Sequence, residues 1–426
     1  MTDLSTTRLT MSSDAQRALE RAGAMLTLFA LGLRQPIHTG ITTGFLLAML
    51  LAPVWLVRIR RYRGAIPLLL LGSAAVIAGQ LLSAYSSDTN VVVASFRLSS
   101  TALLLGTLCT IGVVLWARTV LSGSAVAAWY GVGMLVGPVL ERTPSQGNAW
   151  KFVFGLPVAI VVLAIAGRRS RAWEFVALAG LALTSIHFDS RSYFATLLLT
   201  GSVVLWQVRP RAVRRRASAA GTAVVFALIG AATYFVGTTL LVNGYLGADA
   251  QSRSIAQIQT SGSLILGGRP ELQATLALFK ERPLGFGMGV VANPHDVLVA
   301  KSGLTNVNYA PNNGYVDRYM FGNQIELHSV LGDIWAQAGV LGIALVAMLA
   351  YLITGGLVRR IANGTAGALL VFVSVWSLWC LAFSPFFASA PILALAVGLG
   401  LTVKRGGAGT PPDDSQACPE TARPRR

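Results

Sequence analysis

The chain has 426 residues, of which 54% are hydrophobic and only 12% are charged, and its mean hydropathy is +0.62. Soluble domains carry about 25% charged residues, so this composition excludes an ordinary soluble protein. The net charge of +17 does not indicate nucleic-acid binding, because the arginines stand in short clusters between apolar runs rather than on one polar domain.

Apolar runs recur along the chain at a length of about 17–25 residues, which allows a helix to cross a bilayer. We therefore predict an all-α integral membrane protein with about twelve transmembrane helices. The predicted spans are 21–33, 39–57, 65–84, 99–117, 120–140, 152–167, 172–188, 192–208, 217–240, 328–356, 365–385 and 387–403.

The distribution of positive charge predicts the topology. Every even-numbered span is followed by lysine or arginine, as the positive-inside rule requires for cytoplasmic loops. With both termini cytoplasmic, 23 of the 34 lysines and arginines lie inside, and six of the 11 others lie in one long polar stretch. The first span is short, and the N-terminus would lie outside if that span were only re-entrant.

The pattern predicts five regions along the chain. They are a cytoplasmic tail (1–20), a nine-helix membrane region (21–240), an extracytoplasmic segment (241–327), a three-helix membrane region (328–405) and a disordered cytoplasmic tail (406–426). Residues 241–327 are called the polar segment below. No cleavable signal pattern is recognised in the first twenty residues.

Cysteine usage and short motifs give little information about function. Cys109 and Cys380 fall in predicted spans and Cys418 falls in the tail, so no disulfide is expected in the polar segment. No metal-ligand spacing and no nucleotide-binding glycine motif is present, and we expect neither a metal nor a cofactor.

The first charged site is the short turn from His187 to Ser192, between the seventh and eighth predicted spans. Arg191 must lie at or just below the membrane surface there, because the connection is so short. Two explanations fit this position: a surface arginine that snorkels or pairs with Asp189, or an anion clamp that faces a cavity.

The second charged site begins at Arg269 in the polar segment and continues into residues 270–282. These residues place Leu272, Leu276 and Phe279 on one face, which predicts an amphipathic helix on the membrane surface. Arg269 would then stand beside the free N–H groups at the helix start, where an anion is favoured. The alternative is a solvated arginine at a helix cap.

A glycine turn follows this predicted helix. Gly285, Gly287 and Gly289 stand at alternate positions, and glycine permits unusual dihedrals or the close approach of a ligand to the backbone. We count Gly287 as a possible supporting residue of the site.

The third site is His328, which opens the tenth predicted span. A lone histidine at an interface is commonly structural, but Glu326 is placed to orient or charge this one. Asp333 lies on the same predicted helix, where a polar side chain requires a partner. His38 and His295 have no comparable neighbours, and we interpret both as structural or solvated.

Together, the three sites resemble the O-antigen ligase and O-antigen polymerase superfamily. The stretch ELHSVLGDIWAQAGVLG (326–342) is similar to the family signature, in which a histidine opens a late span ahead of spaced glycines. The stretch GGRPELQATLALFKERPLGFGMG (267–289) is similar to the family's arginine, amphipathic helix and glycine turn, and DSRS (189–192) matches a Ser-Arg pair before an earlier span. Ser329 and Gln337 depart from the asparagine and glutamate that are frequent in the family.

The resemblance implies an enzyme of the bacterial plasma (inner) membrane that transfers a glycan from a polyprenyl diphosphate. The acceptor would be a hydroxyl of a glycan, glycolipid or wall polymer outside the membrane. Arg191 and Arg269 would clamp the diphosphate without a metal, because arginine forks match phosphate oxygens. His328 would activate the acceptor hydroxyl, and one displacement would invert the anomeric carbon. Asp189, Glu326 and Gly287 would support the site.

Three alternatives stay open on the sequence. A polymerase would join one lipid-linked repeat to another, and a related oligosaccharyltransferase would act on protein hydroxyls. A transporter or flippase of a lipid-linked glycan would perform no chemistry. Transporters tend to place charges near the bilayer midplane, whereas here the unusual charges cluster at the predicted outer face.

Overall fold

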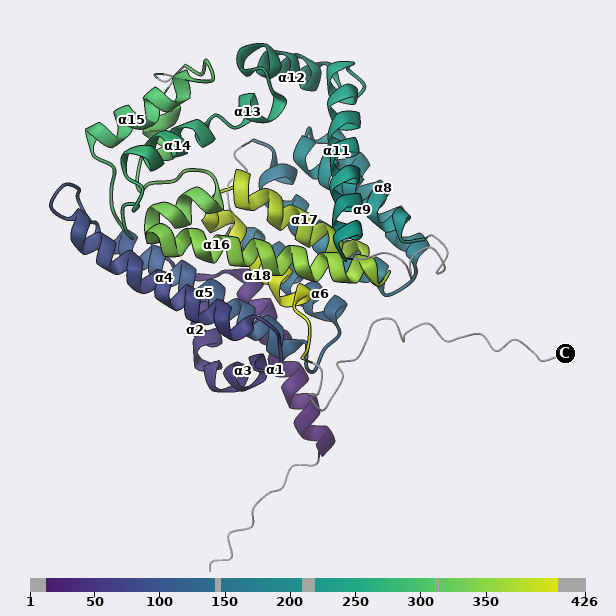
Figure 1. Cartoon of the computed structure of the whole chain (residues 1–426). Coiled ribbons are helices and arrows are strands. Elements are labelled where there is room, and N and C mark those ends of the chain that lie inside the picture. Colours follow the sequence, from purple (N-terminus) through teal and green to yellow (C-terminus); the bar gives the residue numbers. More distant parts are fainter. Residues whose placement is uncertain (1–12, 142–146, 209–218, 311, 313, 405–426) are drawn as a thin grey trace, which may run out of the picture.

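The computed structural model describes residues 13–141, 147–208, 219–310, 312 and 314–404, and within these ranges the chain is almost wholly helical (Figure 1). The elements of the first half are α1 (Ser13–Leu33), β1 (Pro36–His38), β2 (Ile41–Thr42), α2 (Thr43–Leu50), α3 (Ala52–Ile59), α4 (Ala65–Ser86), α5 (Ala94–Ala117), α6 (Gly123–Leu140), η1 (Trp150–Phe154), α7 (Gly155–Gly167), α8 (Arg171–His187) and α9 (Arg191–Trp206). The elements of the second half are α11 (Ala219–Val242), α12 (Ala248–Ser261), α13 (Leu264–Gly268), α14 (Glu271–Glu281), α15 (Pro294–Thr305), η2 (Val316–Met320), α16 (Val330–Ala362), α17 (Ala368–Phe383) and α18 (Phe386–Gly400). The predicted tail 406–426, with Cys418, lies outside the described residues, as do residues 1–12.

Six described helices are long and apolar enough to cross a membrane. They are Ala65–Ser86, Ala94–Ala117, Gly123–Leu140, Trp150–Gly167, Ala220–Val242 and Val330–Ala362. The shorter helices α17 and α18 are also apolar. The chain is therefore a helical, membrane-embedded protein, as its composition predicts. The count of twelve spans, the orientation of the loops and the five-region division stay predictions.

The first two predicted spans differ from the structure. The helix α1 begins at Ser13, well before the predicted start of the first span. The predicted span 39–57 is not one helix, because the hairpin β1–β2 is followed by two eight-residue helices, α2 and α3. The break falls at Leu51, two residues before Pro53, which is favoured in the first turn of a new helix. The continuous apolar composition concealed this boundary.

Close helix packing depends on small residues, as at the crossing of α1 and α6. A Cβ atom at Gly32 would lie 2.1 Å from the carbonyl oxygen of Tyr130, and one at Gly133 would lie 2.2 Å from that of Phe29. Only glycine allows the two backbones to come this close, which is a common means of packing helices in a bilayer.

Polar side chains from distant helices fix the ends of α17 and α18. The buried carboxylate of Glu174 accepts the Ala368 N–H at the start of α17 (3.1 Å) and pairs with Arg171 (2.7 Å). Arg118 donates to the carbonyl of Leu401 at the end of α18 (2.9 Å). An acid at a helix start and a base at a helix end complement the helix dipole, so these contacts hold both helices in the bundle.

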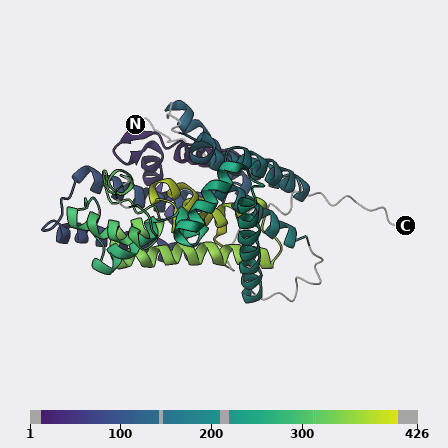
Figure 2. The same ribbon diagram turned by 90° about the horizontal axis from the view of Figure 1, so that it is seen from above.

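Much of the polar segment packs with the start of α16 around a second hydrophobic core. In Figure 1 its helices α12 to α15 lie along one side of the molecule, and Figure 2 shows α14 and α15 gathered near the beginning of α16. Buried residues of α14, α15, η2 and the glycine turn join those of α16 in one cluster that includes Leu278, Phe286, Leu304, Met320 and Trp335. This core holds the segment together without a disulfide.

The helix α14 matches the predicted amphipathic helix at 270–282. Ala274 and Leu278 are buried toward α15, whereas Leu276 and Phe279 are 51% and 38% exposed. An exposed apolar stripe on a short helix is typical of contact with lipid or with another apolar surface.

A kink in α16 lies where the polar segment is bonded to the bundle. Gly339 has φ 61° and ψ −140°, which interrupts the helical hydrogen bonds at that point. The carbonyl of Ala336 accepts the N–H groups of Phe286 (2.8 Å) and Gly287 (2.9 Å). The glycine turn is thus bonded directly to the kinked helix.

The glycine turn has the unusual dihedrals that the sequence predicts, but its close neighbour is helix backbone rather than a ligand. Gly285, Gly287 and Gly289 have φ values of 86°, 110° and 75°. A Cβ atom at Gly287 would lie 2.3 Å from the backbone nitrogen of Ser83 in α4. The close approach is therefore to helix backbone, and the turn at Gly287 fastens the polar segment to α4 and α16.

Candidate functional site

The sequence suggested that His328 opens the helix. In the structure it lies in a turn just before α16. Its φ is 53°, a left-handed conformation that is uncommon for a residue other than glycine, and Ser329 caps the helix that follows. Residues held in such conformations cost free energy and are often found at functional sites. The side chain is half-buried.

The contact of His328 with Glu326 determines which ring nitrogen is available. Nδ1 lies 3.2 Å from the main-chain carbonyl oxygen of Glu326. A carbonyl oxygen only accepts, so Nδ1 carries the hydrogen and the neutral ring leaves Nε2 as a proton acceptor. Glu326 thus orients the ring through its backbone, while its carboxylate accepts from the side chain of Gln324 (3.3 Å).

Asp333 holds the His328 turn in place. Its Oδ1 accepts the Leu327 N–H and its Oδ2 accepts the Phe386 N–H, each at 2.7 Å, and the carboxylate is buried. One side chain therefore ties the residue before His328 to the start of α18. The sequence indicated that a polar side chain in this helix requires partners, and these two backbone N–H groups supply them.

Tyr315 is a neighbour of His328 that sequence reasoning missed. The centroids of the two rings are 5.9 Å apart, and the Tyr315 hydroxyl donates to Oε1 of Glu271. Burial and the adjacent carboxylate raise the pKa of Tyr315 well above its ordinary value. Glu271 is 6% exposed, and its Oε2 makes no hydrogen bond with the described residues. No local pattern signals this pair, because its members are 44 residues apart.

Arg191 begins α9 and is held by α12. Its Nη1 donates to the hydroxyl of Ser254 (2.9 Å) and to the amide oxygen of Gln257 (3.4 Å). Asp189 does not neutralise it by an ion pair, because Asp189 pairs with Arg253. The surface pair between Arg191 and Asp189 is therefore replaced by a pair between the α8–α9 turn and Arg253 of α12. The hydrogen-bond partners of Arg191 are neutral, while Asp189 acts on it at longer range.

Arg269 follows directly after α13 and precedes α14. Its side chain is half-buried and forms no hydrogen bond or ion pair with the residues that the structure describes. Its charge acts on the Tyr315 hydroxyl. Arg269 is thus a guanidinium next to the His328 neighbourhood with its donors available.

Contacts through α12 bring the Arg191 and Arg269 regions together. Gln257, which accepts from Arg191, packs against the two glycines before Arg269. A Cβ atom at Gly267 would lie 2.5 Å from the Gln257 carbonyl oxygen, whereas one at Gly268 would lie 3.5 Å from its amide nitrogen. Glycine at 267 is therefore required for this approach.

Lys151 adds a further positive charge that sequence reasoning missed. It lies on the π-helical turn η1, and its ammonium group is within electrostatic range of Arg191, Arg253 and Arg269. Short π-helical turns are rare and frequently occur at functional sites. Three arginines thus lie within electrostatic range of Lys151, although Arg253 is paired with Asp189. The group is a candidate for anion binding, and Arg269 connects it to Tyr315, the ring neighbour of His328.

No cluster of three or more histidine, cysteine or acidic side chains suited to a metal occurs among the described residues. The cations of the candidate site carry donors for an anion, and its two described acids, Asp189 and Glu271, are bonded to other side chains.

Comparisons with protein-family models, with curated proteins and with solved structures found no match.

Proposed function

We propose that the chain is a glycosyltransferase similar in its chemistry to O-antigen ligases. It moves a glycan from a polyprenyl diphosphate to an acceptor hydroxyl at the outer face of the plasma membrane, without a metal and with inversion. The observation that carries this proposal is Arg269, a half-buried guanidinium with no carboxylate partner among the described residues, in a group of like charges. A desolvated charge without a partner is costly, so such a group favours a bound anion.

The cations suit a diphosphate. Arg191 is held by a hydroxyl and an amide, so it is oriented without a direct ion pair. Arg269 carries free donors in a planar fork, which can bind two phosphate oxygens at once. Lys151 adds a point charge to the same field. Together these groups stabilise the negative charge that develops on a departing diphosphate.

His328 suits the role of base. Its Nε2 accepts the proton of the acceptor hydroxyl while that oxygen forms a bond to the anomeric carbon. The bond from this carbon to the diphosphate oxygen breaks, and the polyprenyl diphosphate leaves with the electron pair. The Nδ1 hydrogen, held by the Glu326 carbonyl, stabilises the imidazolium that forms. A single displacement of this kind inverts the configuration.

Exposed apolar side chains beside the site suit the lipid part of the donor. Leu276 and Phe279 lie on the exposed face of α14, and Leu331 and Val340 are exposed on the first part of α16. A prenyl chain in the bilayer can pack against these side chains, because it is as apolar as the lipid tails that it replaces. The diphosphate would then be directed toward Arg269.

The direct test is glycan transfer by the purified full-length chain with a labelled polyprenyl-diphosphate-linked glycan and a crude envelope acceptor. His328→Ala is expected to lower the turnover at least about a hundredfold, which is the usual contribution of a general base. Its matched control is His38→Ala, at an exposed position on β1. Wild-type turnover by His328→Ala would remove the base from the scheme.

The arginine clamp is tested by Arg269→Lys, which keeps the charge and loses the fork. We expect a loss of about tenfold or more in kcat/KM, since a bidentate charged hydrogen bond is replaced by a single donor. Arg168→Lys, at an exposed position after α7, is the control. Full activity of Arg269→Lys would contradict the clamp.

The product separates the remaining possibilities. A longer lipid-linked chain would indicate a polymerase, and a labelled protein would indicate an oligosaccharyltransferase. Movement of the donor across a liposome membrane without a new glycosidic bond would contradict a transferase. Retained transfer in EDTA is expected, because the proposed clamp supplies its charge from side chains.

A further inference from the structure

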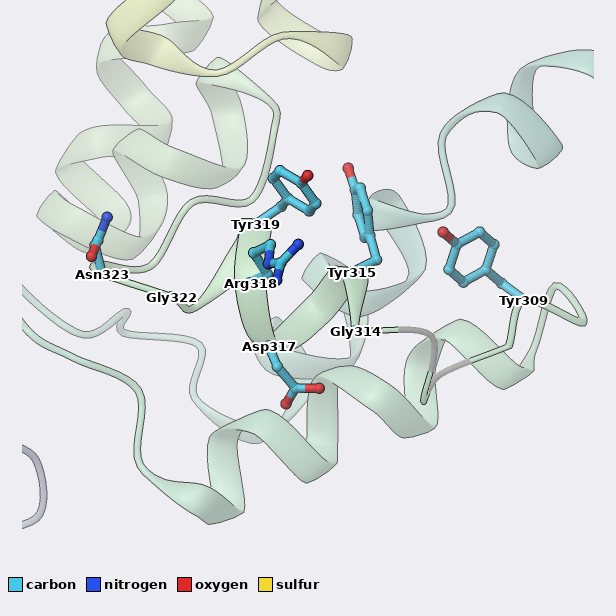
Figure 3. A pocket seen from close by; sticks show the side chains of 8 residues that line it. All are labelled: Tyr309, Gly314, Tyr315, Asp317, Arg318, Tyr319, Gly322 and Asn323. Carbon is cyan, nitrogen blue, oxygen red and sulfur yellow. The ribbon is translucent and has the colours of Figure 1, made fainter. Parts of the chain in front are cut away.

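A hollow of about 890 Å³ opens on the polar segment (Figure 3). Three tyrosines line it: the ring centroids of Tyr309 and Tyr315 are 6.1 Å apart, and those of Tyr315 and Tyr319 are 5.6 Å apart. Arg318 and Asn323 add polar groups to the same lining. Its size is that of a site for a small ligand.

We propose that this hollow is a saccharide subsite, in which a sugar ring of the acceptor stacks on Tyr319 and Tyr315. The identification of the saccharide as the acceptor rests on the proposed transferase function. The stacking itself is a property of the hollow and is testable without any reaction.

The tyrosines are arranged as a preformed wall. The Tyr315 hydroxyl is bound to the buried carboxylate of Glu271, which fixes the ring in the lining of the hollow. Tyr319 is 56% exposed and tilted by 36° to Tyr315, so the two rings form an angled surface rather than a closed stack. Preformed aromatic surfaces bind at a low entropic cost, because few rotamers are lost.

The charges of the hollow also suit a hydroxylated ligand. Asp317 points away from the tyrosines in Figure 3 and pairs with Lys301 at 2.8 Å. Arg318 forms no side-chain hydrogen bond or ion pair with the described residues. Its fork and the Asn323 amide can therefore bond to the hydroxyls of a sugar whose C–H face lies on a ring.

The lining excludes a lipid chain as the preferred occupant. Among the described residues that line the hollow there is no leucine, isoleucine, valine or methionine. An acyl or prenyl chain favours aliphatic walls, and those occur on α14 and α16 instead. A sugar combines apolar C–H faces with polar edges, which matches rings interleaved with donors.

The position of the hollow connects it with the proposed reaction. Tyr315 belongs both to its wall and to the ring pair with His328, whose centroids are 5.9 Å apart. A sugar held on Tyr315 therefore lies beside the proposed base. The subsite would present the terminal hydroxyl of an acceptor chain to Nε2.

The experiment is fluorescence anisotropy of labelled maltohexaose, chitohexaose and mannohexaose with the full-length chain in detergent micelles. We expect at least one probe to bind, and Tyr319→Ala to weaken the best one about fivefold to tenfold, the equivalent of one aromatic contact. Tyr319→Phe keeps the ring and should bind within about twofold of wild type. Tyr245→Ala, at an exposed tyrosine elsewhere in the polar segment, is the matched control and should bind like wild type.

Several results would overturn the subsite: no probe binds, Tyr319→Ala binds as wild type does, or Tyr245→Ala weakens binding equally. Because Tyr319 is exposed, its loss should leave the fold intact, and Arg318→Ala provides a second variant that should also weaken binding. Transfer without saccharide binding would retain the proposed function and reject the subsite. Saccharide binding that depends on Tyr319, without any transfer, would retain the subsite and reject the proposed function.

Discussion

Replacing Asp333 by asparagine tests how the His328 turn is held. The carboxylate is 3% exposed and uses both oxygens, one for the Leu327 N–H and one for the Phe386 N–H, each at 2.7 Å. Asparagine has nearly the same shape but only one acceptor oxygen. Its amide nitrogen would face a backbone N–H, so that two donors meet where a donor and an acceptor met before.

The size of the effect follows from these contacts. One charge-assisted hydrogen bond is lost, and at least one backbone donor is left buried without a partner. Each such loss costs about 1–3 kcal/mol, so we expect the free energy of unfolding of Asp333→Asn to fall by about 2–3 kcal/mol. Freed from this tie, Leu327 no longer fixes the left-handed backbone of His328, and glycan transfer should fall as well.

The assay is SDS titration of the full-length chain in mixed micelles, followed by tryptophan fluorescence. Asp88→Asn, at an exposed carboxyl in the loop after α4, is the matched control and should change the free energy by less than about 0.5 kcal/mol. If Asp333→Asn were as stable as this control, the two hydrogen bonds would not hold the turn, and the reasoning from their geometry would be refuted.

Three further predictions concern backbone approach and ionisation. In Gly267→Ala the new Cβ would lie 2.5 Å from the Gln257 carbonyl oxygen, so the KM for the donor should rise several-fold. In Gly268→Ala the nearest contact is 3.5 Å, to the Gln257 amide nitrogen, and the KM should not change. Equal kinetics of the two variants would contradict the role of α12. Gly287 has a φ of 110°, and a Cβ there would lie 2.3 Å from helix backbone, so Gly287→Ala should lower the free energy of unfolding by about 2 kcal/mol or more. Gly180→Ala is the control, because a Cβ at Gly180 meets open space, and its free energy of unfolding should not fall. The pKa of Tyr315 is raised in the folded chain. The unfolded chain therefore loses the phenol proton near the ordinary value of 10.0, while the folded chain retains it. The free energy of unfolding should then fall as the pH rises above about 10. Tyr315→Phe should reduce that decline in SDS titrations between about pH 9 and about pH 11, and an unchanged decline would show that other groups cause it.

The sequence predicted the long apolar helices because length and composition alone define them. The predicted spans near α4 to α9 and α16 to α18 correspond to described helices with ends shifted by a few residues. The division of the second span into α2 and α3 was missed, because the flanking residues stay apolar across Leu51. Pro53 was the available signal, and its preference for a first helical turn could have located the boundary.

The candidate site was predicted only in part. Arg269 and His328 were recognisable from their setting, but their partners were not, since those lie far away in the chain. Tyr315 finds Glu271 through the packing of the polar segment, and the same is true of Asp189 with Arg253. The left-handed backbone of His328 was also not predicted, because residues other than glycine adopt it uncommonly and tertiary contacts decide where they do.

The bond between the glycine turn and the kinked helix has a consequence for biogenesis. The N–H groups of Phe286 and Gly287 have their acceptor at Ala336, about fifty residues later in translation. The polar segment therefore emerges from the ribosome before the helix that fastens it has been synthesised. The glycine turn can be fastened only after α16 is inserted, so a chain truncated ahead of that helix would carry all four cations of the candidate site but lack the bonds that hold the polar segment in place.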